Sequence, residues 1–133
     1  MSIGTKASLR VRISAADAHY GGGLVAGAKV LELFGDVATE LCIRTDGDEG
    51  LFAGYSSVEF LGPVTAGDFL EVTGEVTRIG ETSREISFTA VRYAKSSPEV
   101  SDSAADLTAS PEPVARAIGT CVVLKDRQRG SSG

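Results

Sequence analysis

The segment that most constrains the fold is a helix-like stretch, residues 24–43, that is apolar on nearly every side. Its apolar residues recur at three- and four-residue intervals, and the stripe they form is wider than that of a surface helix. The members are Leu24, Val25, Ala28, Val30, Leu31, Leu33, Phe34, Val37, Ala38, Leu41 and Cys42. The pattern predicts one long helix that is mostly buried and that the rest of the chain must cover.

Segments with the composition and alternation of β-strands lie on both sides of this helix. They are residues 7–13, 53–64, 68–80, 82–94 and 114–126. A strand, one long helix and then a run of antiparallel strands is an α+β order, in which a single sheet buries such a helix only by curling around it. A chain of 133 residues suits one core. We therefore predict a single α+β domain over residues 1–133, with a curved antiparallel sheet wrapped around one central helix.

Two segments lack such patterns. Residues 96–113 are rich in Ser, Ala, Asp and Pro and nearly devoid of large apolar groups, which predicts a long mobile loop, with a lid over a ligand as the alternative. Residues 128–133 are expected to form a flexible tail. A curved open sheet also leaves an exposed edge. Because pairing with a second copy is a common way to cover an edge, we expect a homodimer.

Composition excludes several classes of partner. With 13 Lys and Arg against 18 Asp and Glu, and no basic run, the chain is not expected to bind nucleic acid. The sequence has no apolar run long enough to span a membrane and no signal-like N-terminus, so a cytoplasmic protein is expected. Cys42 and Cys121 lie in apolar surroundings without CxxC spacing, which predicts buried small side chains without a redox role. With one histidine, no metal site is predicted.

The entry to the predicted helix carries the first candidate site. His19 and Tyr20 precede Gly21, Gly22 and Gly23, and the first N–H groups of a helix lack internal acceptors. Without a Cβ in the way, an oxyanion or enolate could approach these donors and the positive end of the helix dipole. An ordinary glycine connection is an equally good interpretation of the glycines alone. His19 is a candidate functional residue, whereas Tyr20 either packs on the helix or lines the site.

Three carboxylates share one face of the predicted helix, because Glu32, Asp36 and Glu40 are four residues apart. Like charges so placed cost a few tenths of a kcal/mol per pair and call for compensation. Glu32 is expected on a solvated face, relieved by Lys29. Asp36 lies deep in the apolar stretch, where desolvation would raise the pKa of a carboxylate and make it a stronger base. Asp36 is therefore the first candidate general base, and Glu40 is the second. Glu59 is a candidate site residue or an outward strand residue.

Two longer stretches carry a resemblance. "YGGGLVAGAKVLELFGDVATEL" and "SVEFLGPVTAGDFLEVTGEVTRIGETSREISF" resemble the hotdog-fold acyl-CoA enzymes, over roughly residues 7–124. With "DAHYGG" and "DGDEGLFAGYSSVEFLGPVTAGDF", the pattern is similar to the small 3-aminobutyryl-CoA ammonia lyases of lysine fermentation and to relatives that act on β-alanyl-CoA. Many acyl-CoA hydrolases of the fold place an aspartate in the second helical turn, where this chain has Lys29. That difference favours a lyase over a hydrolase.

The resemblance implies a carbon–nitrogen lyase that reversibly eliminates ammonia from 3-aminobutyryl-CoA to give crotonyl-CoA. The alternatives are a thioesterase of the same fold, an enoyl-CoA hydratase and a CoA-binding module without catalysis. The implied catalytic residues are Asp36, His19 and Glu40, and the implied substrate-binding residues are Asp17, Tyr20, Gly21, Gly22, Gly23 and Glu59.

No metal or organic cofactor is implied, since coenzyme A is part of the acyl-CoA substrate. Its phosphates would need cations at the ends of strands, for which the candidates are Arg78, Arg84, Lys125 and Arg127. The resemblance further implies a site built from two subunits of the homodimer, with His19 and Asp36 from different chains. A hexamer, as a trimer of dimers, is the larger assembly expected.

Overall fold

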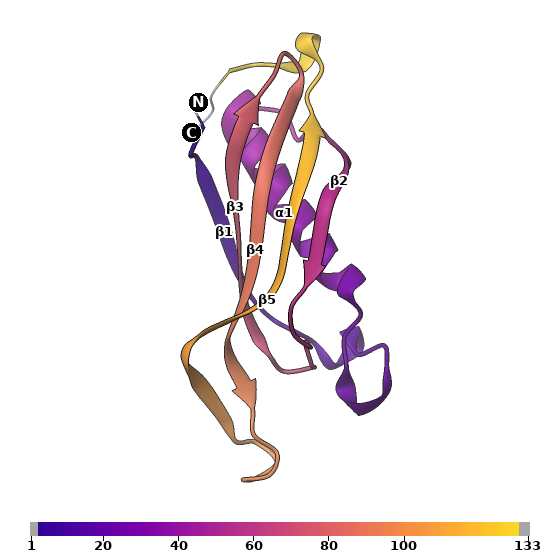
Figure 1. Cartoon of the computed structure of the whole chain (residues 1–133), viewed down its shortest axis with the longest axis vertical. Coiled ribbons are helices and arrows are strands. Elements are labelled where there is room, and N and C mark those ends of the chain that lie inside the picture. Colours follow the sequence, from indigo (N-terminus) through magenta and orange to yellow (C-terminus); the bar gives the residue numbers. More distant parts are fainter. Residues whose placement is uncertain (1–2, 131–133) are drawn as a thin grey trace.

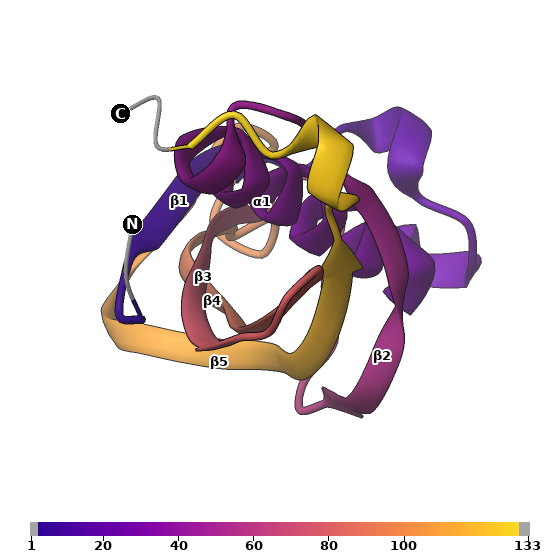
Figure 2. The same cartoon turned by 90° about the horizontal axis from the view of Figure 1, so that it is seen from above.

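Five strands form one antiparallel sheet that curls around a single long helix (Figures 1 and 2). The computed structural model describes residues 3–130. The elements are β1 (Lys6–Arg12), α1 (Gly27–Asp46), β2 (Leu51–Phe60), β3 (Phe69–Ile79), β4 (Ser83–Ser96) and β5 (Ala105–Val122), with short 3-10 helices at Ala15–Asp17, Gly21–Gly23 and Lys125–Arg127. The strand order is β1-β3-β4-β5-β2, so β1 and β2 are the edges. The predicted α+β hotdog fold is confirmed.

Alternation along the strands places the core on the concave face of the sheet. In β3 the buried residues Leu70, Val72 and Val76 alternate with more exposed ones, as period-2 patterning requires. Gly74 belongs to the same inward row, and a Cβ there would lie 2.8 Å from Cγ1 of Val37 in α1. A glycine at this point therefore allows the helix to approach the sheet closely.

One face of α1 packs on this sheet and the other is open. Phe34 is fully buried, and its ring stacks on Phe88 of β4 at a centroid distance of 5.1 Å. Seen from above, the sheet covers the helix from below and from both sides (Figure 2). The helix therefore has one buried and one open face, whereas the sequence pattern predicted burial on nearly every side. Several of its small or apolar residues are only partly covered in the single chain.

The helix begins three residues later than predicted. Leu24 and Val25 are extended, and they form isolated bridges with Thr65 and Ala18 respectively. These pairings compete with helical hydrogen bonds, so α1 starts at Gly27. At the other end Gly47 adopts φ +66° and donates its N–H to the carbonyl of Ile43, which ends the helix.

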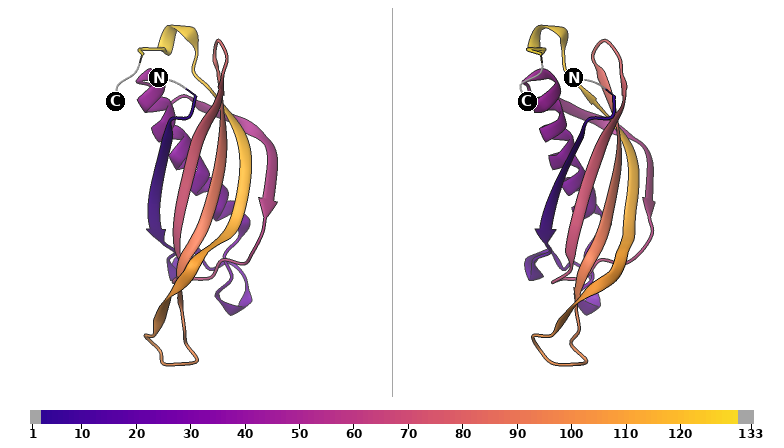
Figure 3. Two further views of the ribbon diagram at one scale, coloured as in Figure 1. Left: turned by 60° about the vertical axis from the view of Figure 1, so that its left-hand side comes forward. Right: turned by 90° about the vertical axis from the view of Figure 1, so that its left-hand side faces the viewer.

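The prediction of a long loop over 96–113 is wrong for residue 96, which ends β4, and for residues 105–113, which belong to β5. Beyond the body of the sheet, Ala94, Lys95 and Ser96 pair with Leu107, Asp106 and Ala105. We call residues 94–107 the arm, and Figures 1 and 3 show it projecting from the sheet as a hairpin. Its residues are mostly exposed. The sequence therefore carries no alternating pattern there, although the backbone pairs.

The prediction of a flexible tail over 128–133 is wrong for residues 128 and 129. The Gln128 amide donates to the carbonyls of Glu81 and Val123, and the Arg129 N–H donates to the carbonyl of Asp46. These bonds hold residues 128 and 129 against the end of the helix. Residues 131–133 lie outside the described part of the chain.

Candidate functional site

The three glycines form a loop ahead of α1 and not its first turn. Gly21–Gly23 form a short 3-10 turn in which Gly22 and Gly23 both have φ +74°, a conformation that side-chain-bearing residues rarely adopt. The carbonyl of Leu24 accepts N–H groups from both His19 and Tyr20, at 2.9 and 3.0 Å, and so closes the loop. The expectation that these glycines lie at the start of the helix is therefore wrong, because α1 begins at Gly27. We call residues 18–25 the glycine loop.

His19 and Tyr20 project from the glycine loop. Both side chains are exposed, Tyr20 by 57%, and their rings meet edge to face at a centroid distance of 4.8 Å. The interpretation of Tyr20 as a residue packed on the helix is wrong, because its ring contact is with His19 and it remains largely open to solvent. Both side chains are thus available to a substrate or to a second subunit.

Lys29 connects the first turn of α1 to the segment that leads into the loop. Its Nζ lies 3.6 Å from Oδ1 of Asp17 and 3.3 Å from Oε1 of Glu32. Partial burial lowers the pKa of Lys29, but the Glu32 hydrogen bond and the Asp17 charge outweigh it and raise that pKa. Asp17 also accepts the N–H of Ser14 at 3.2 Å. In the single chain Asp17 is therefore occupied by structural contacts, although it was predicted to bind substrate.

Of the three helix carboxylates, only Asp36 lacks a partner among residues 3–130. Glu32 is paired with Lys29, and Glu40 with Arg44 at 2.8 Å. The expected burial of Asp36 is wrong for the single chain. Phe34 and Val37 face the sheet, and the helical period turns position 36 away from it, toward solvent. Asp36 is therefore an unneutralised carboxylate on the open face of α1.

Glu59 lies on the opposite side of the sheet from the core. It is paired with Arg116 of β5 at 3.6 Å, and both side chains are 56% exposed. The two residues beside Arg116 in β5, Ala115 and Ala117, are buried and face α1. In the single chain Glu59 is therefore an outward-facing strand residue, as one of its two interpretations predicted. The structure does not bring Glu59 together with the glycine loop.

Arg84 is unavailable to a CoA phosphate, which corrects the prediction for this residue. Its guanidinium forms two bonds to the Asp46 carboxylate, at 2.9 and 3.0 Å, and two more to the carbonyls of Gly80 and Ser83. The Asp46 hydrogen bond raises the pKa of Arg84 despite its burial. A buried cation that has a buried carboxylate partner is a structural group.

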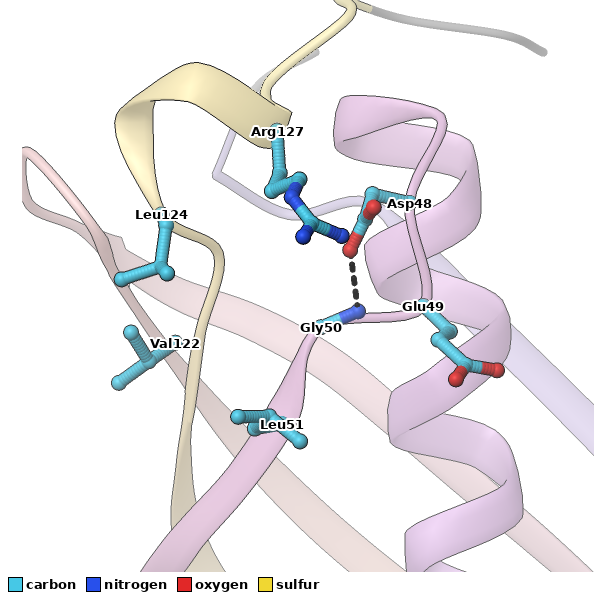
Figure 4. A pocket seen from close by; sticks show the side chains of 7 residues that line it. All are labelled: Asp48, Glu49, Gly50, Leu51, Val122, Leu124 and Arg127. Carbon is cyan, nitrogen blue, oxygen red and sulfur yellow. Dashed lines mark hydrogen bonds between the residues drawn. The ribbon is translucent and has the colours of Figure 1, made fainter.

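The other residues predicted to bind the CoA phosphates lie, like Arg84, near the C-terminal end of α1. Lys125 pairs with Glu81 at 2.8 Å. Arg127 lines a cavity of about 240 Å³ and points toward Asp48 (Figure 4). Together with Arg78 near the end of β3, these cations lie by the C-terminal end of α1, whereas the glycine loop lies by its N-terminal end (Figure 1). One chain does not bring the two sets together.

A buried carboxylate that sequence reasoning missed holds the glycine loop from the sheet side. Asp68 is fully buried and accepts from the N–H and hydroxyl of Thr65, at 2.8 and 3.1 Å, and from Arg92 at 3.2 Å. These bonds fix the turn. The N–H of Ala66, in this turn, donates to the carbonyl of Gly23 at 2.9 Å and so connects the turn to the glycine loop. The sequence signal was a Thr three residues before an Asp in a turn, a spacing typical of side-chain to backbone bonding.

Other expected features can be located directly. Cys42 and Cys121 are free thiols that are 1% and 2% exposed, which confirms the prediction of buried small side chains. Within residues 3–130 no group of three or more His, Cys, Asp or Glu side chains is arranged to hold a metal ion. No helix in the same part of the chain is long and apolar enough to cross a membrane.

Comparison with known proteins places the chain in a family. Residues 22–94 match the family model described as the thioesterase superfamily. The chain is 56% identical, over 124 residues, to a 3-aminobutyryl-CoA ammonia lyase of Acetoanaerobium sticklandii, covering 93% of this chain and 98% of that one. Its structure matches the β-alanyl-CoA:ammonia lyase of Clostridium propionicum with a TM-score of 0.94 and 38% identity, over 99% of this chain and 94% of that one.

More distant structures share the fold. A hexameric hotdog-fold thioesterase of Campylobacter jejuni matches with a TM-score of 0.72 and 18% identity, over 92% of this chain and 86% of that one. The match of the family model, the identity over nearly the whole chain and the common architecture agree. The chain therefore belongs to the thioesterase superfamily, and it has the hotdog fold.

Proposed function

We propose that this protein is an ammonia lyase that reversibly eliminates ammonia from 3-aminobutyryl-CoA, or from a similar short 3-aminoacyl-CoA, to give crotonyl-CoA. The observation that carries this proposal is the 56% identity to a 3-aminobutyryl-CoA ammonia lyase across 93% of the chain. The structural match to a β-alanyl-CoA:ammonia lyase supports the same reaction type on a related substrate. Lysine fermentation is the proposed metabolic context.

The reaction needs a base, a site for enolate charge and a pocket that accepts an ammonium group. In our proposal Asp36 removes the proton from the carbon next to the thioester, and the electron pair moves onto the thioester oxygen. As the enolate collapses, the carbon–nitrogen bond breaks and ammonia leaves with that bond's electron pair, while the proton stays on Asp36. An unpaired carboxylate on the open face of α1 suits both the base and the attraction of the ammonium group.

Backbone N–H groups at Gly22 and Gly23 are proposed to stabilise the enolate oxygen, because a glycine loop lets the substrate approach the backbone closely. His19, exposed on the same loop, is proposed to support the proton transfer. Glu40 is the weaker candidate because Arg44 neutralises it. Since Asp36 and the glycine loop are both open to solvent in one chain, a second subunit is proposed to close the site.

The assembly we propose is a homodimer, with a hexamer built from three dimers as the larger form. The exposed edge strand β2, with Leu51 and Phe60 uncovered by 72% and 57%, supports association with a second copy. No metal or organic cofactor is needed for the proposed steps, because the thioester itself makes the neighbouring proton acidic. A cytoplasmic location is part of the same proposal.

The test is to incubate purified protein with crotonyl-CoA and ammonium, following the loss of enoyl absorbance, the mass of the product and any free thiol. Formation of 3-aminobutyryl-CoA without thiol is expected. Asp36→Asn should lower kcat by at least about 100-fold, as loss of a general base does. Glu32→Gln, on the same face of α1, is the matched control and should retain activity.

Thiol release without an amine adduct would overturn the proposal in favour of a thioesterase. The hydratase alternative predicts a hydroxyacyl-CoA product instead. CoA binding without any turnover would identify a non-catalytic module. Comparing acryloyl-CoA with crotonyl-CoA under the same conditions ranks the β-alanyl and 3-aminobutyryl substrates.

A further inference from the structure

Two neighbouring cavities lie where the arm joins the body of the sheet. The first, of about 420 Å³, is lined by Arg12, Ile13, Ser14, Ala15, Ala66, Gly67 and Ser96. The second, of about 280 Å³, is lined by Phe69, Tyr93, Ala94, Ala105, Asp106 and Leu107. Arg12 connects them, because it lines the first and its guanidinium carbon lies 5.3 Å from the centre of the Phe69 ring. The two cavities are therefore adjacent, separated by the contact of Arg12 with Phe69.

The first cavity has the chemistry of a phosphate site. Arg12 is exposed and has no carboxylate partner among residues 3–130, whereas its neighbour Arg10 is bound to Glu71 at 3.0 Å. The Ser14 hydroxyl accepts the Ala16 N–H at 3.0 Å and keeps its own O–H to donate. An unpaired guanidinium beside a hydroxyl donor matches the oxygens of a phosphate group.

The second cavity has the chemistry of a site for a flat aromatic ring. Phe69 and Tyr93 lie with ring centroids 5.9 Å apart, and Leu107 of the arm, which also lines the cavity, is 79% exposed. The Arg10 guanidinium lies 4.7 Å from the centre of the Tyr93 ring, so a base would stack on the other face of that ring. Apolar walls with aromatic rings favour stacking of a base, which every base permits. Asp106 already accepts the Ser97 hydroxyl, and its remaining lone pairs can accept an exocyclic amine.

We propose that these cavities bind the nucleotide end of the CoA thioester, with phosphate oxygens at Arg12 and the adenine ring between Tyr93 and Leu107. The proposal rests on the proposed function for the identity of the whole substrate. Ser14 and Ala15, on the wall of the first cavity, begin the segment that leads to His19. The arm and this segment lie at the same end of the molecule (Figures 1 and 3), so the nucleotide and the reacting thioester would be held at one end of α1.

The probe for this site is adenosine 3′,5′-bisphosphate, measured by isothermal titration calorimetry. Arg12→Gln should weaken its binding by about 10-fold or more, the loss expected for a hydrogen bond to a charged group. Tyr93→Leu should weaken it by about 10-fold through lost stacking, and Tyr93→Phe should retain most of it. Lys6→Gln, which removes an exposed cation from the other end of β1, is the matched control and should bind like the unaltered chain.

Thermal melting first verifies that Arg12→Gln and Tyr93→Leu are folded. The proposal is overturned if both variants then bind the bisphosphate as well as the unaltered chain does. It is also overturned if the bisphosphate binds but does not compete with crotonyl-CoA for binding. In the enzymatic assay Arg12→Gln should raise the KM for crotonyl-CoA about 10-fold without changing kcat, and should leave turnover of crotonyl-pantetheine unchanged. If no lyase activity is found while CoA binding follows the expected pattern, the proposed function fails and the nucleotide site stands.

Discussion

Lys29 Nζ lies 3.6 Å from Asp17 Oδ1, so a cation in the first turn of α1 ties the helix to the segment that leads into the glycine loop. A cation is unfavourable at that end of a helix by roughly 0.3–1 kcal/mol. Glu32 and Asp17 offset this cost. Lys29 is therefore shared between two carboxylates near the loop, whereas Asp36 has no cation partner among residues 3–130.

Replacing Lys29 by Met should loosen the glycine loop and lower kcat, because Asp17 loses the contact that ties its segment to α1. A double-mutant cycle of Lys29→Met with Asp17→Asn should give a coupling free energy of about 0.5–1 kcal/mol in urea unfolding. Arg44→Met removes an ion pair confined to the same helix and is the control, with unchanged kcat. A coupling of zero would show that the contact contributes nothing.

Arg84→Met should be among the most damaging substitutions in the chain. It leaves the Asp46 carboxylate buried without its partner, at an expected cost of roughly 3–5 kcal/mol in the free energy of unfolding. Replacing both residues by apolar ones should recover most of that loss. The comparison is Lys125→Met, whose exposed pair with Glu81 should be worth less than about 1 kcal/mol. Equal effects of the two single substitutions would contradict the structural role of Arg84.

Gly74→Ala should destabilise the protein by about 1–3 kcal/mol, because its Cβ would meet Val37 at 2.8 Å and Leu41 at 3.2 Å in a packed core. Gly54 lies in β2 with nothing within 4 Å of the corresponding Cβ. Gly54→Ala is therefore the matched control, with a neutral or slightly favourable effect. Denaturant unfolding of both variants measures the difference, and a stable Gly74→Ala would mean that α1 shifts without cost.

Tyr55 should contribute to stability in a pH-dependent way. Its hydroxyl donates to the Leu31 carbonyl at 2.9 Å, and burial raises the pKa of Tyr55 to about 12. The unfolded tyrosine ionises near pH 10. Because the folded pKa is the higher one, this contribution is complete below pH 10 and is lost as the pH rises toward 12. The stability advantage over Tyr55→Phe, about 1 kcal/mol at pH 8, should shrink across that range.

Thermal or urea unfolding between pH 8 and 12 measures this change. Tyr20→Phe is the matched control, since it removes the hydroxyl of a tyrosine that is exposed. A constant difference between the unaltered chain and Tyr55→Phe at all pH values would show that Tyr55 ionises normally in the folded protein.

Local patterns predicted the strands and the helix well, because alternation and helical spacing report which side of each element is buried. They failed where backbone pairing is not accompanied by burial. Residues 105–113 pair in β5 but stay mostly exposed, so their composition resembled a loop. Likewise Leu24 and Val25 fit a helical period, yet their bridges to Thr65 and Ala18 make them extended.

For the site, the sequence identified the glycine loop, the helix carboxylates and the placement of Lys29 beside an exposed Glu32, which the structure confirms. It did not show that Arg44 pairs with Glu40 or that Lys29 also reaches Asp17, since side-chain pairing depends on rotamers and on neighbouring segments. Nor did it single out Asp68, whose burial follows from the turn that surrounds it.

What the sequence by itself determined is the set of elements, the curved-sheet architecture and the family, because these follow from local periodicity and from ordered motifs. Only the tertiary structure decided which charges are free. Arg84 and Asp46 are 38 residues apart in the chain, yet the sheet brings them together and removes both from solvent. Arg12, an ordinary strand residue in the sequence, lines a cavity and has no carboxylate partner in the described part of the chain. Whether a charge is structural or available to a substrate depends on its neighbours in space, which the linear order of residues does not contain.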